Sequence, residues 1–416
     1  MNHFSEKLLP VLDKIAIVSL FVFAAFCMFS ISITQIAAGL GGLAWLLRTH
    51  ITKTWQEQRW PLGLPFILFV LANLVAVINA YSTIDSYPEL KKLLEFLIFF
   101  WVVNYVRENR LRDSLSTILI LTATLAGLHG FYQGWRDGLN IDNRVAGTMS
   151  VYMTFAGLLM IVGMMGLGRI LFRRPRENWL WFALIVISIC LLFTFTRQAW
   201  FGFLAGLIFL MFAWQRKATL IIAGLTLVSL LVYGSQMQSK VMQATKYKDL
   251  SSQTPSFVKV MKYRINRMIS GKDETLAMRI ALWRGGWEII KDHPLTGCGF
   301  HCVDLIGQQY PDPSGYVNRI RGMHNNYVQL AVDTGFLGLS SWIGIWVCFF
   351  ALLYKRARTL EGDSSSWIIY GSTAAGIAFL AGGFFESNIY DSEVAMVLYF
   401  IMALPFAGSK IEKLEN

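Results

Sequence analysis

Long apolar runs separated by short polar segments dominate the sequence. A helix needs about 17–25 apolar residues to cross a bilayer, and shorter helices are accepted in a packed bundle. Because a backbone in lipid must satisfy its own hydrogen bonds, these runs predict helices. We expect about twelve, at residues 15–32, 35–48, 63–81, 92–106, 114–132, 149–172, 179–195, 199–214, 218–235, 330–353, 367–385 and 393–408. The predicted fold class is therefore an all-α, polytopic membrane bundle.

The polar connections alternate between strongly basic segments and nearly neutral or acidic ones. The basic clusters are Arg48, Lys53 and Arg59; Arg107, Arg110 and Arg112; Arg169, Arg173, Arg174 and Arg176; Arg216 and Lys217; and Lys355, Arg356 and Arg358. Cytoplasmic loops are enriched in Lys and Arg, so both termini are predicted to be cytoplasmic. We divide the chain into nine helices over 1–235, an extracytoplasmic loop over 236–329, and three helices with a cytoplasmic C-terminus over 330–416.

Composition excludes some classes of protein. Of the 416 residues, 55% are hydrophobic and only 15% are charged, whereas soluble domains have about 25% charged residues. The net charge of +11 comes largely from short clusters between apolar runs, which argues against a continuous nucleic-acid-binding stripe. We expect no nucleic-acid partner.

The long loop is basic in its own right. Between Ser235 and Met323 it has thirteen Lys or Arg and seven Asp or Glu. Within it, 275–292 carries Arg279, Trp283, Gly286, Trp287 and Ile290 at helical spacing, and His293-Pro294 ends the pattern. This pattern predicts an amphipathic helix with an arginine on its apolar stripe. Two interpretations stay open: the arginine snorkels from a helix at the membrane surface, or it binds a ligand.

The five cysteines divide into two groups. We interpret Cys27, Cys190 and Cys348, inside apolar runs, as small buried hydrophobes. Cys298 and Cys302 lie in the long loop and either form a disulfide in an oxidising compartment or remain free thiols. The Cys and His residues do not show the spacing of zinc ligands, so we expect no metal and no cofactor.

His324 lies where the long loop enters a predicted helix. A histidine at the water boundary can accept a proton near neutral pH, although such a residue is more often structural. The residues that follow His324 favour a functional role over a structural one, because His324-Asn325 is followed after nine residues by Gly335-x-x-Gly338.

This arrangement resembles the signature of the O-antigen ligase superfamily, which also includes O-antigen polymerases and bacterial O-linked oligosaccharyltransferases. Three further segments resemble motifs of the same superfamily. They are Thr196-Arg197-Gln198-Ala199-Trp200; Arg279-x-x-x-Trp283 with the later Pro294-Leu295-Thr296-Gly297-Cys298-Gly299; and Arg144-Val145-Ala146-Gly147-Thr148. Gln198 stands where the family more often has Gly, and Asp333 where it commonly has Glu.

The resemblance implies a GT-C-like membrane glycosyltransferase of lipopolysaccharide biosynthesis. Such an enzyme moves a preassembled glycan from undecaprenyl diphosphate to the lipid A-core oligosaccharide, at the periplasmic face of the bacterial inner membrane. It implies an inverting transfer that needs no metal. The alternatives are a polysaccharide polymerase, an O-linked oligosaccharyltransferase and, in a different class, a transporter of lipid-linked glycans.

Residue types assign the predicted roles. Arginine stays charged and binds phosphate oxygens through two N–H groups, so Arg197, Arg279 and Arg144 are predicted to hold the donor diphosphate. His324 is predicted to be the general base for the acceptor hydroxyl. Supporting roles are predicted for Asn325, Gly335, Gly338 and Asp391. The remaining loop arginines Arg319 and Arg321 are expected in water or at lipid headgroups.

The charge pattern makes the orientation testable. In a background without native cysteines, the substitutions Lys259→Cys and Gly271→Cys should react with a membrane-impermeant maleimide on intact spheroplasts. Arg173→Cys and Lys355→Cys should react only after permeabilisation, because their loops are cytoplasmic. Labelling of intact cells at residue 173 but not at 271 would reverse the orientation.

Overall fold

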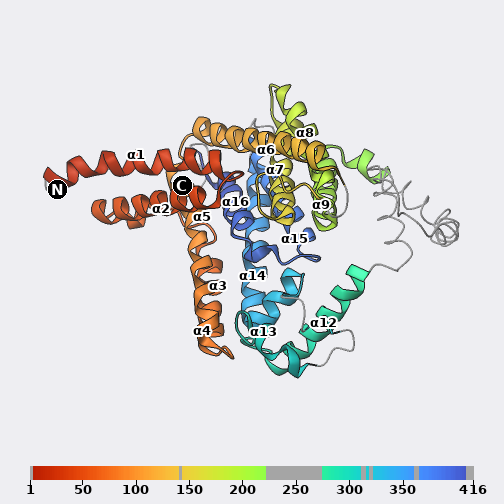
Figure 1. The fold of residues 1–416 in the computed structure, drawn as a ribbon. Helices are drawn as coiled ribbons and strands as arrows, with labels where there is room; N and C mark the ends of the chain where they lie inside the picture. The colour runs from red at the N-terminus through yellow and green to blue at the C-terminus, as the bar shows by residue number, and fades with distance from the viewer. Residues whose placement is uncertain are drawn as a thin grey trace.

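A computed structural model describes residues 3–139, 143–221, 274–310, 315–317, 322–359 and 365–408. Every regular element in these ranges is helical (Figure 1). Several sequence predictions fall outside the described residues: most of the expected helix at 218–235, the labelling positions Lys259 and Gly271, and Arg319 and Arg321. The division of the chain at 235 and 329 also stays a prediction.

The helices follow the order of the predicted apolar runs. They are α1 (His3–Phe26), α2 (Ile31–Thr52), η1 (Trp55–Glu57), α3 (Gly63–Ile78), α4 (Thr83–Ser86), η2 (Tyr87–Glu95), α5 (Phe96–Tyr105), α6 (Asn109–Asp137), α7 (Tyr152–Phe172), α8 (Trp179–Phe193), α9 (Arg197–Trp214), α12 (Glu274–Asp292), α13 (Cys302–Ile306), η3 (Gly307–Gln309), α14 (Asn326–Thr359), α15 (Ser366–Gly382), η4 (Asn388–Tyr390), α16 (Ser392–Ala403) and η5 (Leu404–Phe406).

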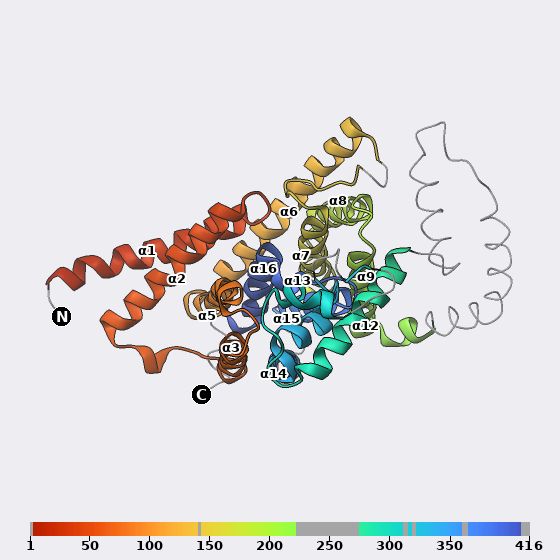
Figure 2. The ribbon, with the colours of Figure 1, turned by 60° about the horizontal axis from the view of Figure 1, so that its bottom comes forward.

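Among the described residues, six helices are long and apolar enough to cross a membrane: α1 from Lys7, α2, α6, α7, α9 and α14. Shorter apolar helices are α3, α8, α15 and α16 with η5. The prediction of a polytopic helical membrane protein is confirmed, while the number twelve stays a prediction. Helices α1 and α2 lie side by side and extend away from the other helices in both views (Figures 1 and 2).

Burial separates the core of the bundle from its outer surface. Helix α7 is the central element, since its residues from Thr154 to Ile170 are all buried. Cys27 and Cys190 are buried as predicted, but the prediction for Cys348 was wrong, because it is exposed on α14. An apolar run does not tell which face of a membrane helix meets protein and which meets lipid. The two alternatives for the loop cysteines were a disulfide or free thiols, and the structure has the Cys298–Cys302 disulfide.

A break in α14 receives the loop that follows α12. Gly335 has φ 63° and ψ −166°, so the helical ladder is interrupted there. In an unbroken helix, the N–H groups of residues 336 and 337 would donate to the carbonyls of residues 332 and 333. All four groups instead bond to the loop: Phe336 N to Pro294 O (2.8 Å), Leu337 N to Leu295 O (3.2 Å), Cys298 N to Val332 O (2.9 Å) and Gly299 N to Asp333 O (3.0 Å). The loop therefore replaces one missing turn of hydrogen bonds.

Glycines allow this close approach of two backbones. A Cβ atom on Gly335 would lie 2.3 Å from the carbonyl carbon of Leu295, and one on Gly297 would lie 2.5 Å from that of Asp333. Both glycines also have positive φ angles, which a residue with a side chain rarely adopts. Gly338 makes a different contact, because a Cβ there would collide with the side chain of Thr334 within α14.

The same loop is held on its other side by the segment that follows α3. Tyr81 N donates to Cys298 O (2.9 Å), and Ser86 Oγ donates to Phe300 O (3.0 Å). His301 Nε2 lies 3.2 Å from Glu89 Oε1. Burial raises the pKa of Glu89, but Lys92 and His301 outweigh this effect and hold it below its ordinary value. The loop after α12 is thus fixed between α14 and 80–89.

The break gives a stability prediction. Gly335→Ala should lower the midpoint of thermal unfolding in detergent, since a left-handed backbone alone costs a residue with Cβ about 1–2 kcal/mol. Gly344→Ala in the same helix is the matched control, because a Cβ there meets nothing within 4 Å. That control should leave the midpoint unchanged or raise it slightly. Equal midpoints for Gly335→Ala and wild type would contradict the docked loop.

Candidate active site

Helix α12 carries Arg279 and confirms the predicted amphipathic helix. Its buried face differs from the predicted stripe: Leu282 and Ile289 are fully buried, whereas Trp287 is 54% exposed. Gly285 and Gly286 explain the rotation, because their missing side chains let Val317 and α14 approach this face. The predicted period was right, and the predicted face was wrong at Trp287.

The C-terminal end of α12 is also fixed. Tyr310 Oη donates to Asp292 Oδ2 at 2.6 Å. Burial, and then this bond, raises the pKa of Tyr310 to about 12, so the hydroxyl stays a neutral donor near pH 7. Together with the docked loop, this contact sets where the rest of α12 points.

Arg197 lies at the first position of α9, after a tight turn in which Phe195 has φ 50°. Its Nη2 donates to the hydroxyl of Thr275 near the start of α12. Thr275 and Arg279 are four residues apart and therefore share one face of that helix. The structure thus brings Arg197 to the helix face that carries Arg279, although 82 residues separate the two in the sequence (279 minus 197).

His324 lies two residues before the first residue of α14 and has φ 46°, a conformation that persists only where the surroundings hold it. Asn325 supplies part of that support: its side-chain oxygen accepts from Tyr327 N (2.9 Å) and Val328 N (3.1 Å), which caps the helix. The same side chain donates to Phe384 O (3.0 Å). Asn326 N also donates to Gly383 O (2.7 Å). The start of α14 is therefore joined to the last loop, between α15 and α16.

Glu386 lies in that last loop and contacts the histidine. Its Oε1 is 3.0 Å from His324 Nδ1, and both side chains are largely buried. An ionised carboxylate only accepts hydrogen bonds, so neutral His324 carries its proton on Nδ1 in this pair. The other ring nitrogen, Nε2, then keeps a lone pair that can accept a proton.

Gln198 connects Glu386 to α9, because its Nε2 donates to the second oxygen of Glu386 at 3.4 Å. Gln198 is the neighbour of Arg197 in the first turn of α9. On the opposite side, Trp283 Nε1 donates to Met323 O at 3.0 Å, directly before His324. The two arginine-bearing helices and the histidine are therefore linked through both α9 and α12. We name the set Arg197, Gln198, Arg279, Trp283, His324 and Glu386 the contact ring.

Asp333 supports the ring from within α14. Its two oxygens accept from Gln329 Nε2 at 3.0 and 2.9 Å. Gln329 Oε1 in turn accepts from Met323 N at 2.7 Å. The residue that replaces the family's usual Glu thus orients the backbone next to His324.

The other predicted site residues lie outside the contact ring. Arg144 stacks on the ring of Tyr152, with 4.5 Å from guanidinium carbon to ring centroid. Asp391 caps α16 through Val394 N (3.3 Å) and accepts from Thr154 Oγ1 (2.5 Å). Gly335 forms the break in α14. The functional roles of these residues, and of His324, Arg197 and Arg279, stay predictions.

Sequence reasoning missed two members of the ring as functional candidates. The sequence does not single out Glu386, whose short acidic loop is typical of a solvated segment, and Gln198 is noted only as a departure from the family's Gly. The available signal was that Glu386 lies in a short loop on the side predicted for His324. In the described part of the chain, no three His, Cys, Asp or Glu side chains are grouped to hold a metal ion.

Comparisons with known proteins find two similarities. Residues 182–343 match the family model described as "O-Antigen ligase", a range that includes Arg197, Arg279 and His324. Over 106 residues the chain is 30% identical to the exopolysaccharide production protein ExoQ of Rhizobium meliloti (strain 1021). The aligned part is 24% of this chain, and the chain spans only 24% of that relative. Residues 182–343 of this multi-pass membrane protein are therefore similar to the O-antigen ligase family.

Proposed function

We propose that the protein is a glycosyltransferase that moves a preassembled glycan from undecaprenyl diphosphate to the lipid A-core oligosaccharide. The reaction takes place on the periplasmic face of the bacterial inner membrane, with both chain termini in the cytoplasm. The observation that carries the proposal is the contact ring. Arg197 bonds to the helix face that carries Arg279, and a carboxylate-bound histidine is linked through its neighbours to both helices, although these residues are distant in sequence.

The arginines supply the donor side of the reaction. Arg197 lies at the N-terminal end of α9, where the partial positive charge of the helix adds to that of the guanidinium. Two arginines on adjoining helix faces match the two phosphates of a diphosphate, and each can bind two oxygens. Because they are fixed before the reaction, they stabilise the negative charge that develops as the diphosphate leaves.

The histidine supplies the acceptor side. An acceptor oxygen attacks the anomeric carbon of the donor sugar, the carbon–oxygen bond to the diphosphate breaks, and undecaprenyl diphosphate leaves with the electron pair. The hydroxyl proton moves to His324 Nε2, and Glu386 stabilises the imidazolium that forms. A single displacement inverts the anomeric configuration. With arginines in the role of the cation, this mechanism uses no metal.

A second candidate is a polymerase whose acceptor is another lipid-linked glycan. The similarity to a protein of exopolysaccharide production favours it, and the same residues would perform the same displacement. Purified protein in nanodiscs, given one lipid-linked donor and either lipid A-core or a second lipid-linked glycan, separates the two candidates. The product formed identifies the acceptor.

A first mutational prediction concerns the division of labour. Arg197→Lys and Arg279→Lys keep the charge but lose the two-pronged contact, so donor affinity and transfer should both fall. His324→Ala should leave donor affinity nearly unchanged and lower single-turnover transfer by about 10²–10⁴. Loss of donor binding in His324→Ala with retention in both arginine variants would reverse the roles. A transporter of lipid-linked glycans would form no product and would not depend on a proton acceptor.

A second prediction concerns Glu386. Glu386→Gln removes the charge that stabilises the imidazolium, so transfer should fall while the donor dissociation constant changes little. Glu288→Gln is the matched control, since Glu288 is an exposed residue of α12 paired with Lys291 and should keep wild-type turnover. If both variants turn over equally, Glu386 has no part in the proton transfer.

A further inference from the structure

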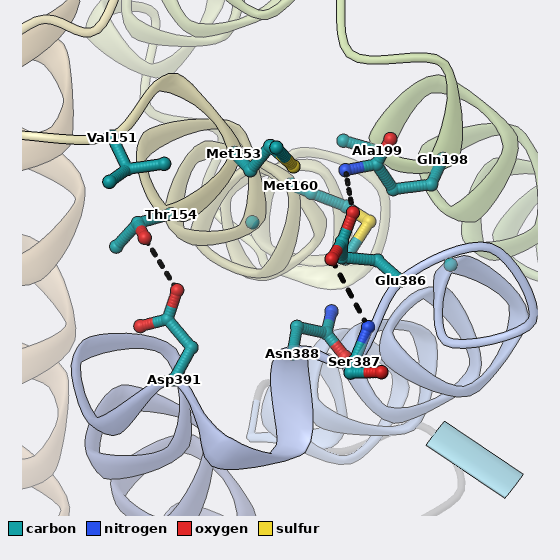
Figure 3. Close-up of a pocket in the computed structure, with 12 residues that line it drawn as sticks. Val151, Met153, Thr154, Met160, Gln198, Ala199, Glu386, Ser387, Asn388 and Asp391 are labelled. Atoms are coloured by element: carbon teal, nitrogen blue, oxygen red, sulfur yellow. Dashed lines mark hydrogen bonds between the residues drawn. The ribbon is translucent and has the colours of Figure 1, made fainter. Parts of the chain in front are cut away.

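A cavity lined by both polar and apolar residues adjoins the contact ring on the side of Glu386 (Figure 3). It has a volume of about 180 Å³ and lies between the start of α7, the first turn of α9 and the loop before α16. Neither His324 nor the two ring arginines line it. Glu386 and Gln198 belong to both the cavity and the ring, so the cavity is a separate space that shares a wall with the candidate active site.

Two buried amides line this cavity. Gln198 and Asn388 are each only 9% exposed. Asn388 uses its oxygen to accept from Asn326 Nδ2 at 2.8 Å, and Figure 3 shows its amide nitrogen pointing into the enclosed space. Across the described chain, no acceptor for that nitrogen is found within hydrogen-bond distance. A buried donor aimed into a cavity indicates a ligand with acceptor oxygens.

The remaining lining chemistry narrows the ligand class. The carboxylates of Glu386 and Asp391 accept hydrogen bonds, the Thr154 hydroxyl and the two amides add both donors and acceptors, and Met153 and Met160 supply apolar surface. Two carboxylates disfavour a phosphate group in the same space. Alternating donors and acceptors beside an apolar wall match a neutral ring with several hydroxyl groups. The volume far exceeds the roughly 30 Å³ of one water molecule and is of the order of one sugar ring.

We propose that this cavity is a subsite for one pyranose ring of the substrate, held through its hydroxyl groups. The proposal rests on the glycosyl transfer proposed above and adds where a substrate sugar binds. Because Glu386 lines the cavity and contacts His324, only one side chain separates a sugar bound there from the proposed base, which assigns the subsite to the acceptor.

The first test narrows the cavity. Val151 lines it and is 44% exposed, so Val151→Trp should fold and obstruct the entrance. Val347→Trp on α14 is the matched control, since Val347 is 61% exposed and is not a lining residue. We expect Val151→Trp to raise the acceptor KM at least about tenfold, as loss of one or two hydrogen bonds would, with the donor KM and the control variant unchanged.

Each outcome of this kinetic test decides the assignment. A rise in the donor KM instead would keep the sugar subsite but give it to the donor glycan. Unchanged KM values for both substrates would overturn the proposal. If Val151→Trp fails to fold, Thr154→Val, which replaces a lining hydroxyl by a methyl group of similar shape, should raise the same KM by a smaller factor, and an unchanged KM would again overturn it.

A binding measurement separates this proposal from the proposed function. Saturation-transfer NMR with methyl α-glucoside, methyl α-galactoside and methyl N-acetylglucosaminide needs no reaction. Binding that Val347→Trp retains and Val151→Trp loses would support the subsite even if no transfer is found. Wild-type protein that transfers glycan but binds none of these probes, or that binds them equally well as Val151→Trp, would overturn the subsite and leave the transfer function intact.

Discussion

The break in α14 at Gly335 is the constraint on which the rest of the site depends. Two carbonyls and two N–H groups that lose their helical partners are satisfied by the loop 294–299, and unsatisfied backbone groups in this environment would each be costly. The loop is the direct continuation of α12, and the start of α14 carries His324. This single contact therefore fixes the position of α12, which carries Arg279, and the position of His324, which is proposed to accept the proton. Because the contact is between backbones, it depends on two glycines rather than on side chains that can adjust.

The sequence predicted the apolar helices from their hydrophobic pattern alone. Arg197, Arg279 and His324 were singled out because their segments resemble motifs of a known superfamily, and their roles stay predictions. Glu386 was not singled out, because its contact joins residues 62 apart and a short acidic loop has the same composition whether it is solvated or packed. Trp287 and Cys348 show a second limit: periodicity gives the width of an apolar face, but the neighbouring helix decides which part of it is buried. At α12, Gly285 and Gly286 determine which part is buried, because they let α14 and Val317 pack against that side of the helix.

Charge is divided across the site. The arginines lie on α9 and α12, and the carboxylates of Glu386 and Asp391 lie in the loop before α16, where Glu386 contacts His324. If the arginines bind the diphosphate, its anionic groups are held by these two helices and not by the loop that carries the carboxylates. That loop then remains suited to hydroxyl groups, whose protons the carboxylates can accept as hydrogen bonds. A single pocket of mixed charge would not separate a leaving diphosphate from an attacking hydroxyl in this way.

Arg144 and Asp391, two of the predicted site residues outside the contact ring, are related through α7. Arg144 stacks on Tyr152 at its first position, and Asp391 accepts from Thr154 two residues later. From Thr154 onward α7 is buried over 17 residues, so its first turn is held firmly in place where Arg144 and Asp391 contact it. The cavity lies against that same turn. In the proposed mechanism, Arg144 therefore acts through the position of α7 and Asp391 through the cavity that it lines, whereas Arg197, Arg279 and His324 act on the reacting groups.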